Sequence, residues 1–519
     1  MFWVDEIVKD ILEKISKERY FLTDWKTPSG HIHVGSLRGV AVHDLVRLGL
    51  TDKRKVAEFQ YGFDDFDPMD GLPVYVEKSY QEYMGKPLCN VPAPDGQSES
   101  YAHQYADEFQ KVFEMIGFKP KIVYNSQLYK KGEYNQVIKK ILDNAAQIRK
   151  IYLEIAGSNK GDDWYPFQIV CPKCGKIGTT KVTDWNGKEV TFICEENLVK
   201  WAKGCGYSGN ISPFDGNGKI PWKVEWAAKW LITKTDIEGE GKDHFAAGGS
   251  RDVADAICRQ VFEKEPPYDI RYEHFLIGGA KMSSSKGLGI SAKDIAEFLP
   301  ANILRFLFTR TRYKRAIDFN PEGETIPLLY DEYDRAALEF QKDPQADLAR
   351  AFYYSQVDPE KEQPQYLLRF SKIAYMLQML RIDIFEYAQK EKGSDLTEIE
   401  KQEVKNRIEI AKNWLANFAP DSYKFTIAKK VPAAAKNLTA RQKEFLAKIS
   451  DIMEEKEKWT GEELHPKIHE IRKAANIDPR EAFSAIYLSF IGKDSGPQAG
   501  WLLASLDRDF VIKRIEEIK

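Results

Sequence analysis

The sequence has 519 residues and a mass of 59.6 kDa, and because an ordinary domain has roughly 100–200 residues, we expect about three or four domains. The formal net charge of −3 excludes a protein that binds nucleic acid over its whole surface, since such proteins are usually basic, and it limits any RNA contact to a local patch. No stretch approaches the roughly 20 consecutive apolar residues of a transmembrane helix, which excludes a membrane-spanning protein.

The first 21 residues alternate acidic and basic side chains in the pattern of an amphipathic helix. They lack the apolar run and the small-residue cleavage site of a signal peptide, so we expect a cytoplasmic protein. Six cysteines are too few for a disulfide framework in a chain of this length. The sequence does not reveal the oligomeric state, for which we expect a monomer.

The next elements predict a βαβ unit with parallel strands. Residues 20–23 form a short apolar run, and a Pro-Ser-Gly turn separates them from residues 33–50, whose apolar side chains recur at helical spacing. A second apolar run at 55–63 ends in the acidic sequence DDFDP at 64–68. In parallel sheets ligands bind at the carboxyl ends of strands. We therefore expect the turn and the acidic sequence at one functional edge.

The turn has the sequence TPSGHIHVGS at 27–36 and allows two interpretations. Ser29 or Ser36 could simply cap the helix that follows. Alternatively, the amino terminus of the helix faces a polyphosphate, Gly30 and Gly35 let the backbone approach it, and His33 donates a hydrogen bond to a phosphate oxygen. The stretch by itself leaves both interpretations open.

Four cysteines follow a helical region at 100–160, and they are Cys171, Cys174, Cys194 and Cys205. The first two form a CPKC sequence, half of a zinc knuckle, and the others could complete a tetrahedral site. The gap between the last two is longer than the two to four residues of an ordinary knuckle. We expect structural zinc, with free thiols or a redox-active CxxC pair as the alternatives.

Alternating strand and helix patterns resume after Pro221, which predicts a discontinuous α/β domain interrupted by an insertion. This second half ends in KMSSSKG at 281–287, where two lysines and three hydroxyls follow Gly278 and Gly279. Such a loop can close positive charge over phosphates, and a solvated surface loop is the alternative.

From Ser291 onward the sequence shows no convincing strand, and its amphipathic helices predict an all-helical final third. The densest basic run follows the first helix after KMSSSKG and consists of Arg305, Arg310, Arg312, Lys314 and Arg315. We expect it to contact RNA phosphates, with a solvated helix face as the alternative.

Together the motifs resemble the signatures of class I aminoacyl-tRNA synthetases. The sequence HVGS at 33–36 resembles their HIGH motif, and KMSSSKG resembles their KMSKS motif. Residues 65–73, the CPKC ribbon, GNGKIPWKVEWAAKW, GKDHFAAGGS, the strand before KMSSSKG and the ending GKDSGPQAGWLLASL are similar to class I lysyl-tRNA synthetases. This similarity extends over most of the chain.

The resemblance implies an α/β protein with a Rossmann-like parallel-sheet catalytic domain, a zinc-ribbon-containing insertion and an all-α anticodon-binding domain at the carboxyl end. We expect residues 1–90 and 221–295 to form the two halves of the catalytic domain, 91–220 the insertion, 296–365 a helical connecting region and 366–519 the anticodon-binding domain.

The resemblance also implies a lysine–tRNA ligase that uses ATP with Mg²⁺. The lysine carboxylate attacks the α-phosphate of ATP, pyrophosphate leaves, and the 2′-hydroxyl of the terminal ribose of tRNA(Lys) takes the lysyl group from the adenylate. Such a reaction needs positioning and charge stabilisation rather than a covalent nucleophile. The alternatives are a class I enzyme for another amino acid, a HIGH-motif nucleotidyltransferase acting on a small molecule, and a non-catalytic RNA-binding relative.

On this basis His33 and Lys281 are expected to stabilise the transition state. Lys286 comes next, because Ser284 stands where the family motif has its second lysine. The expected ATP-binding residues are Gly30, His33, Gly35, Ser36, Asp243, Lys281, Met282, Ser283 and Ser284. For Asp243 and the neighbouring His244 the alternative is a turn before a helix capped by Ser250 or Asp252.

Binding the ammonium of lysine requires carboxylates or neutral acceptors, usually with aromatic walls. The candidates are Asp24, Thr27, Asp64, Asp65, Trp222, Trp226, His244 and Tyr272, although the aromatic residues could equally belong to a core. Two positions depart from the family pattern. Trp25 stands where glycine is common, and Gly39 where an acidic residue often follows the arginine of the signature helix. Asp24 is a candidate to compensate.

Overall fold

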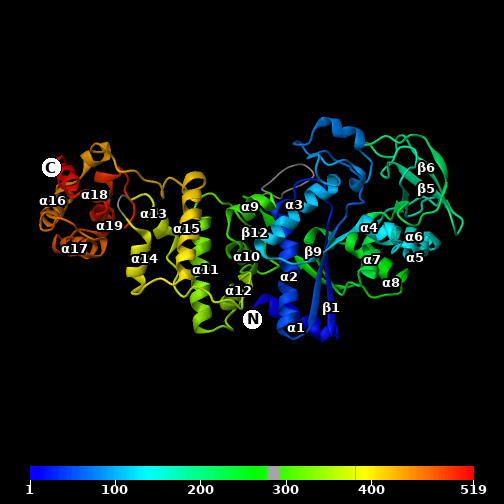
Figure 1. Cartoon of the computed structure of the whole chain (residues 1–519), viewed down its shortest axis with the longest axis horizontal. Helices are drawn as coiled ribbons and strands as arrows, with labels where there is room; N and C mark the ends of the chain where they lie inside the picture. The colour runs from blue at the N-terminus through cyan, green and yellow to red at the C-terminus, as the bar shows by residue number, and fades with distance from the viewer. Residues whose placement is uncertain (279–290, 380–381, 519) are drawn as a thin grey trace. The chain divides into compact units, whose positions relative to one another are not determined.

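The structure is a computed structural model that describes residues 1–278, 291–379 and 382–518 (Figure 1). The chain forms two compact units. The first consists of Met1–Phe319 and Ala336–Pro359, and the second of Asn320–Arg335 and Glu360–Lys519.

A five-stranded sheet organises the first unit. Its order is β10-β9-β1-β2-β3, and every neighbouring pair is parallel. The bounds are β1 Arg19–Lys26, β2 Val56–Phe63, β3 Lys121–Tyr124, β9 Ile237–Gly241 and β10 Tyr268–Tyr272. The predicted parallel α/β sheet is confirmed. Because the strand order reverses at β1, the carboxyl ends of β1, β2 and β9 meet where open α/β sheets bind ligands.

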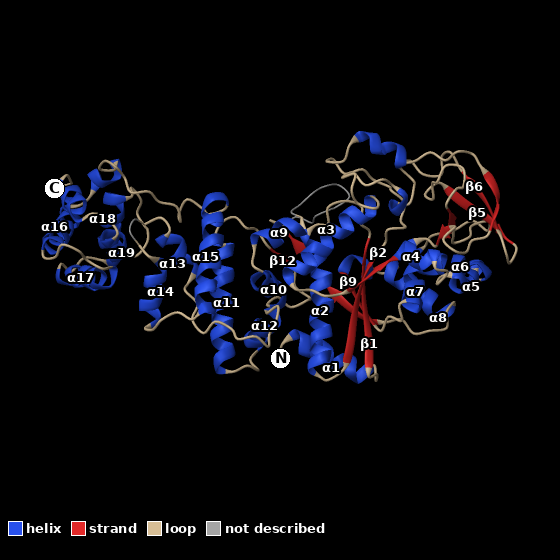
Figure 2. Cartoon of the chain, viewed as in Figure 1, coloured by secondary structure: helices blue, strands red, loops and turns tan. Residues whose placement is uncertain are grey.

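Helix α2 (Leu37–Asp52) connects β1 to β2 after the 3-10 turn η1 (Val34–Ser36). Most of its residues are buried, because it packs against the sheet on one face and against α1 (Trp3–Lys14) and α10 (Ala301–Thr309) on others. Figure 2 shows the strands between α2 on one side and α7 (Trp222–Ile232) and α8 (Ser250–Gln260) on the other. The sheet is thus covered on both faces, as all-parallel sheets are.

The segment between the two halves of the sheet contains helices and a small antiparallel sheet. The helices are α3 (Tyr101–Ile116), α4 (Asn125–Lys130), α5 (Asn135–Asp143) and α6 (Ala145–Ala156), with short turns η2 (Lys78–Tyr83) and η3 (Leu88–Asn90) before them. Strands β5 (Thr180–Trp185), β6 (Val190–Cys194) and β7 (Ser208–Ile211) form the small sheet, and β4 (Gln168–Ile169) pairs with β8 (Gly218–Lys219). Side chains of this segment share one hydrophobic core with α7 and α8, so the segment is packed against these two helices.

The remaining elements of the first unit follow β9. They are η4 (Lys242–Phe245), β11 (Phe275–Leu276), α9 (Ala292–Phe298), β12 (Ile317–Asp318) and α12 (Asp347–Ser355). The strand β12 contradicts the expectation of no strand after Ser291. It has only two residues, and the N–H groups of Ile317 and of Phe319, directly after the strand, donate to the carbonyls of His274 and Leu276. A strand so short leaves no periodic signal in the sequence.

The described residues of the second unit contain helices and loops but no strand, which confirms the predicted all-α carboxyl-terminal domain. Helix α11 (Thr325–Lys342) begins in it and ends in the first unit. The others are α13 (Phe370–Met376), α14 (Ile384–Lys392), α15 (Glu398–Asn417), η6 (Ala433–Asn437), α16 (Ala440–Glu454), α17 (Gly461–Ala474), α18 (Pro479–Phe490), α19 (Ala499–Ala504) and α20 (Arg508–Glu516). Capping boxes at Thr397, Thr439 and Thr460 fix the starts of α15, α16 and α17. Among the described residues we find no helix with the length and apolar character needed to cross a membrane.

Candidate functional site

A cavity of about 440 Å³ opens at the carboxyl edge of the sheet, beside the turn that leads into α2. Residues from β1, β2, β9 and β10, or from the segments directly after them, line it together with α7. The lining residues are Asp24, Trp25, Lys26, Thr27, Asp64, Asp67, Trp222, Trp226, Lys229, Glu238, Gly239, Glu240, Gly241, His244 and Tyr272. Seven of the eight candidates for the amino-acid site therefore surround one cavity, and Asp65 does not.

The signature turn places its two histidines differently. His31 is engaged: its Nδ1 lies 2.8 Å from Glu108, its backbone N–H donates to the Tyr75 hydroxyl, and the bond to Glu108 raises the pKa of His31. His33 is the residue before η1, and its backbone pairs with Ser291. Ser36, directly before α2, makes no side-chain capping bond, so the capping alternative has no support at that residue.

The loop predicted to close over phosphates falls outside the described residues. This applies to Lys281, Met282, Ser283, Ser284 and Lys286. On its two sides the described chain ends at Gly278, after β11, and resumes at Ser291, which pairs with His33. The carboxyl-side flank of the loop therefore lies at the HIGH-like turn.

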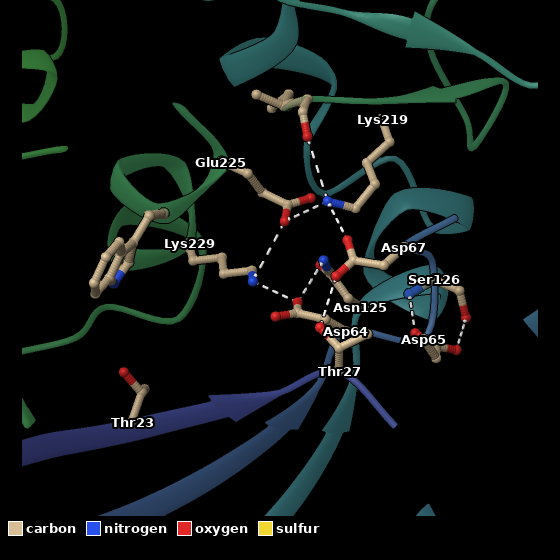
Figure 3. A network of polar contacts seen from close by, with 12 residues as sticks. Thr23, Thr27, Asp64, Asp65, Asp67, Asn125, Ser126, Lys219, Glu225 and Lys229 are labelled. Carbon is tan, nitrogen blue, oxygen red and sulfur yellow. Dashed lines mark hydrogen bonds and ion pairs between the residues drawn. The ribbon is translucent and has the colours of Figure 1, made fainter. Parts of the chain in front are cut away.

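The acidic residues after β2 belong to a buried ionic network (Figure 3). Lys229 Nζ pairs with Asp64 and lies 3.3 Å from Glu225, while Lys219 Nζ lies 2.6 Å from Glu225 and 3.0 Å from Asp67. Burial raises the pKa of Asp64 to about 6 despite the lysine beside it. Because Asp64 already has an ammonium partner in Lys229, it is occupied before any substrate enters.

Thr27 contacts this network, whereas Asp65 lies beside it and has other partners. The Thr27 hydroxyl donates to Asp67 at 2.7 Å and lines the cavity. Asp65 is fully buried and accepts hydrogen bonds from the backbone N–H and the hydroxyl of Ser126 (Figure 3). It anchors the start of α4 and cannot bind a ligand in the cavity.

Two glutamates of β9 line the cavity and were missed from the sequence. Glu238 accepts hydrogen bonds from the indole N–H groups of Trp226 at 2.7 Å and Trp230 at 2.5 Å. Glu240 pairs with Arg251 at 2.6 Å, and its other oxygen has no hydrogen-bond partner among the described residues. The two glutamates are separated by one glycine, so they lie on one face of the strand, and the charged sequence EGE directly before GKDH was the available signal.

The remaining predicted residues lie around the mouth. His244 packs its ring edge against Trp226 and Trp222, with ring centroids 5.2 and 6.2 Å apart, and Trp222 is half exposed. Asp243 is exposed and lies 3.0 Å from His274 Nε2. Helix α8 starts at Ser250, which therefore does not cap it. Asp24 and Tyr272 lie deeper, where burial and the negative charge of Glu238 raise the pKa of Asp24.

Trp25 fits because its strand neighbour is a glycine. Trp25 pairs with Gly62 across β1 and β2, and a Cβ at Gly62 would lie 2.1 Å from the indole ring. The ammonium of Lys229 lies 4.4 Å from the centre of the same ring. This cation–π contact packs the indole against the Asp64–Lys229 ion pair.

The four clustered cysteines converge in the small antiparallel sheet. Their ligand atoms lie within 4.8 Å of one another, with Sγ–Sγ distances of 3.6 Å for Cys171 and Cys205 and 3.7 Å for Cys174 and Cys194. The long gap closes because Cys194 ends β6, Cys205 precedes β7, and these strands pair antiparallel. Residues 195–204 are thus an excursion whose two ends the hairpin holds together.

The basic run divides between the core and the surface. Arg305 is buried, lies 3.3 Å from Asp44 and donates to the backbone carbonyl of Tyr354, so the prediction of an RNA contact is wrong for it. Arg312 is exposed and paired with Glu6. Lys314 and Arg315 are exposed, and an RNA contact stays a prediction for them. The helical periodicity of α10 turns Arg305 inward, which a count of basic residues does not detect.

Comparisons with known proteins agree with this architecture. Residues 1–358 match the family model described as tRNA synthetases class I (K), and residues 368–519 match an anticodon binding domain. The chain is 35% identical to the lysine–tRNA ligase of Methanosarcina barkeri (strain Fusaro), an alignment that covers 99% of this chain and 97% of the relative. It is 32% identical to the lysine–tRNA ligase of Archaeoglobus fulgidus, with 99% of each chain covered.

Among solved structures, a glutamate tRNA ligase from Elizabethkingia meningosepticum matches with a TM-score of 0.44 and 11% identity, covering 97% of this chain and 99% of that chain. The assignment does not depend on this distant match. It depends on the family model, which spans the entire parallel sheet and its cavity, and on relatives aligned from end to end. The chain belongs to the class I (K) tRNA synthetases.

Proposed function

We propose that this chain is a lysine–tRNA ligase that activates lysine with ATP and transfers it to tRNA(Lys) in translation. The observation that carries the proposal is the cavity with an excess of carboxylates and aromatic walls, beside a HIGH-like turn at the carboxyl edge of the sheet. An ammonium side chain suits such a cavity. The names of the full-length relatives, which are lysine–tRNA ligases, support the same substrate.

In this arrangement the lysine side chain enters the acidic cavity and its carboxylate points toward the signature turn. The amino-terminal end of η1, with Gly30, Gly35 and Ser36, faces the phosphates of ATP. His33 and the lysines Lys281 and Lys286 stabilise the charge that develops on the α-phosphate as pyrophosphate leaves. Mg²⁺ accompanies ATP, and residues 368–519 bind the anticodon region of tRNA(Lys).

The decisive experiment measures amino-acid-dependent exchange of pyrophosphate into ATP for all twenty amino acids, with and without tRNA. We expect exchange with lysine alone. Exchange driven by another amino acid would support the alternative of a different specificity. Absence of exchange with every amino acid, in the presence of tRNA as well, would contradict a synthetase. A cytoplasmic monomer remains our prediction for the state in which it acts.

We further propose that Cys171, Cys174, Cys194 and Cys205 bind a structural Zn²⁺. Four sulfurs around zinc at about 2.3 Å are separated by roughly 3.8 Å, close to the two Sγ–Sγ distances of 3.6 and 3.7 Å. The backbone N–H of Cys205 and the hydroxyl of Thr179 lie 3.4 and 3.3 Å from Cys194 Sγ, contacts that suit a thiolate ligand. The bound ion would join the two ends of the residue 195–204 excursion.

Purified protein is therefore expected to contain zinc, and Cys174→Ser to lose it together with the protease resistance of residues 171–211. Metal content measured by mass spectrometry and limited proteolysis test this expectation. Cys89→Ser is the matched control, since Cys89 lies outside the cluster, and it should retain zinc. Metal-free protein with four titratable thiols and an unchanged proteolysis pattern would favour the free-thiol alternative.

A further inference from the structure

The geometry points to Asp24 as the residue that binds the side-chain ammonium of the amino-acid substrate, in a space that Gly39 leaves open. This inference rests on the proposed function and deepens it. It assigns the carboxylate of the specificity site to the end of β1, whereas position 39 on the signature helix, where the resemblance to the family implied an acidic residue, is glycine in this chain.

Among the residues that the structure describes, no lysine or arginine lies in ion-pair contact with Asp24, and the attraction of Lys26 is the weakest of the influences on the pKa of Asp24. Its side chain is 14% exposed, and the nearest basic side chain in an ion-pair contact is His43, at 3.9 Å. Both ring nitrogens of His43 serve the backbone, since Nδ1 lies 2.8 Å from the carbonyl oxygen of Gly39 and Nε2 accepts the N–H of Gly239 at 2.8 Å. Burial lowers the pKa of His43 to about 4, so it is neutral and cannot balance Asp24.

The other acidic side chains of the cavity are already engaged. Asp64 pairs with Lys229 and Asp67 with Lys219. Glu238 accepts two indole N–H groups, and Glu240 pairs with Arg251. Among the described lining residues, Asp24 is therefore the carboxylate with the largest unmet demand for positive charge. A carboxylate held in a low-dielectric cavity without a counter-ion costs free energy, which a bound ammonium recovers.

Gly39 explains how Asp24 reaches this position. A Cβ at residue 39 would lie 2.5 Å from Asp24 Oδ2 and 2.7 Å from the hydroxyl oxygen of Tyr272. Both oxygens therefore converge on the space that any side chain at 39 would occupy. A carboxylate and a hydroxyl at one point supply two acceptors for an ammonium, which has three N–H donors.

The cavity around these oxygens also fits the rest of a lysine side chain. Trp226, Trp222 and His244 supply apolar walls for the methylene groups. The second oxygen of Glu240, which is buried and has no hydrogen-bond partner among the described residues, is the competing ammonium acceptor. The experiment must separate these two carboxylates.

The test measures the KM for lysine and kcat in tRNA charging by Asp24→Asn, together with the calorimetric affinities for L-lysine and for L-norleucine, which lacks the side-chain ammonium. We expect KM for lysine to rise about 100-fold with a smaller change in kcat, because a buried charge pair is lost. We also expect the preference for lysine over norleucine to collapse. The ratio of the two affinities is measured in the same variant, so partial unfolding, which would weaken both equally, cannot lower this ratio. Asp269→Asn, at the opposite end of the sheet in β10, is the matched control and should behave as wild type.

Relocation of the carboxylate provides the second test. Gly39→Glu alone should abolish charging, since its side chain collides with Asp24 and Tyr272. Combining it with Asp24→Ala should restore lysine charging to within about tenfold of wild type, because position 39 on α2 then supplies the carboxylate that position 24 has lost. An unchanged lysine KM in Asp24→Asn assigns the ammonium to Glu240 and overturns the inference. A wild-type enzyme that never charges lysine overturns the proposed function and the inference together, and this is visible before any variant is made.

Discussion

Replacing His33 by alanine is expected to slow formation of the aminoacyl-adenylate by about 10²–10³-fold, the usual cost of removing one preorganised donor to a developing negative charge. The backbone at this turn is held in place independently of the imidazole. Ala292 donates its N–H to the carbonyl of Ile32, and the backbone of His33 pairs with Ser291. Lysine-dependent pyrophosphate exchange measures the loss, and thermal unfolding should be unchanged.

His31→Ala is the matched control, because His31 is bound to Glu108 and Tyr75 in the same turn. We expect it to reduce exchange much less than His33→Ala does. A larger effect at His31 would reverse the assignment of the two histidines.

Lys281→Ala, outside the described residues, is also expected to slow adenylate formation by orders of magnitude with the fold intact.

Replacing Lys219 by methionine is expected to lower the free energy of unfolding of the catalytic unit by about 3–5 kcal/mol. The Lys219 side chain is 3% exposed, and its ammonium contacts Asp67, Glu225 and the backbone carbonyl of Ile220 (Figure 3). Its removal leaves two buried carboxylates with only part of their neutralising charge. Urea unfolding followed by tryptophan fluorescence measures the loss.

Lys188→Met provides the comparison for this variant, since Lys188 is an exposed lysine of the same inserted segment. Its unfolding curve should superimpose on that of the wild type. If Lys219→Met also left the curve within about 0.5 kcal/mol of wild type, the network would contribute nothing net to stability.

The parts of the site that the sequence predicted depend on local signals. The glycine-containing turn at 27–36 and the acidic end of β2 lie where the βαβ pattern places them. The neighbour of β1 on its other side is β9, from the distant half of the domain, and no local pattern predicts that pairing. For this reason Glu238 and Glu240, which only this pairing brings to the cavity, escaped notice.

Residues that look alike in the sequence have different roles in the structure because they differ in burial. Asp64 and Asp65 are adjacent, yet one lines the cavity and the other holds α4. Arg305 and Arg315 belong to one basic run, yet one lies in the core and the other on the surface. Long-range contacts such as that between Arg305 and Asp44 make these distinctions, and they depend on the complete fold.

The contact between Trp25 and Gly62 has an evolutionary consequence. Because a side chain at 62 would collide with the indole in its observed position, we expect a tryptophan at 25 to arise in an ancestor that already has glycine at 62, and glycine to be retained there afterwards. The same order is expected at residues 24 and 39. A carboxylate at 24 in β1 fits only when residue 39 on α2 is glycine, so the glycine should come first. In an alignment of relatives, both pairs should therefore covary, and the glycine should appear on the older branch of the tree.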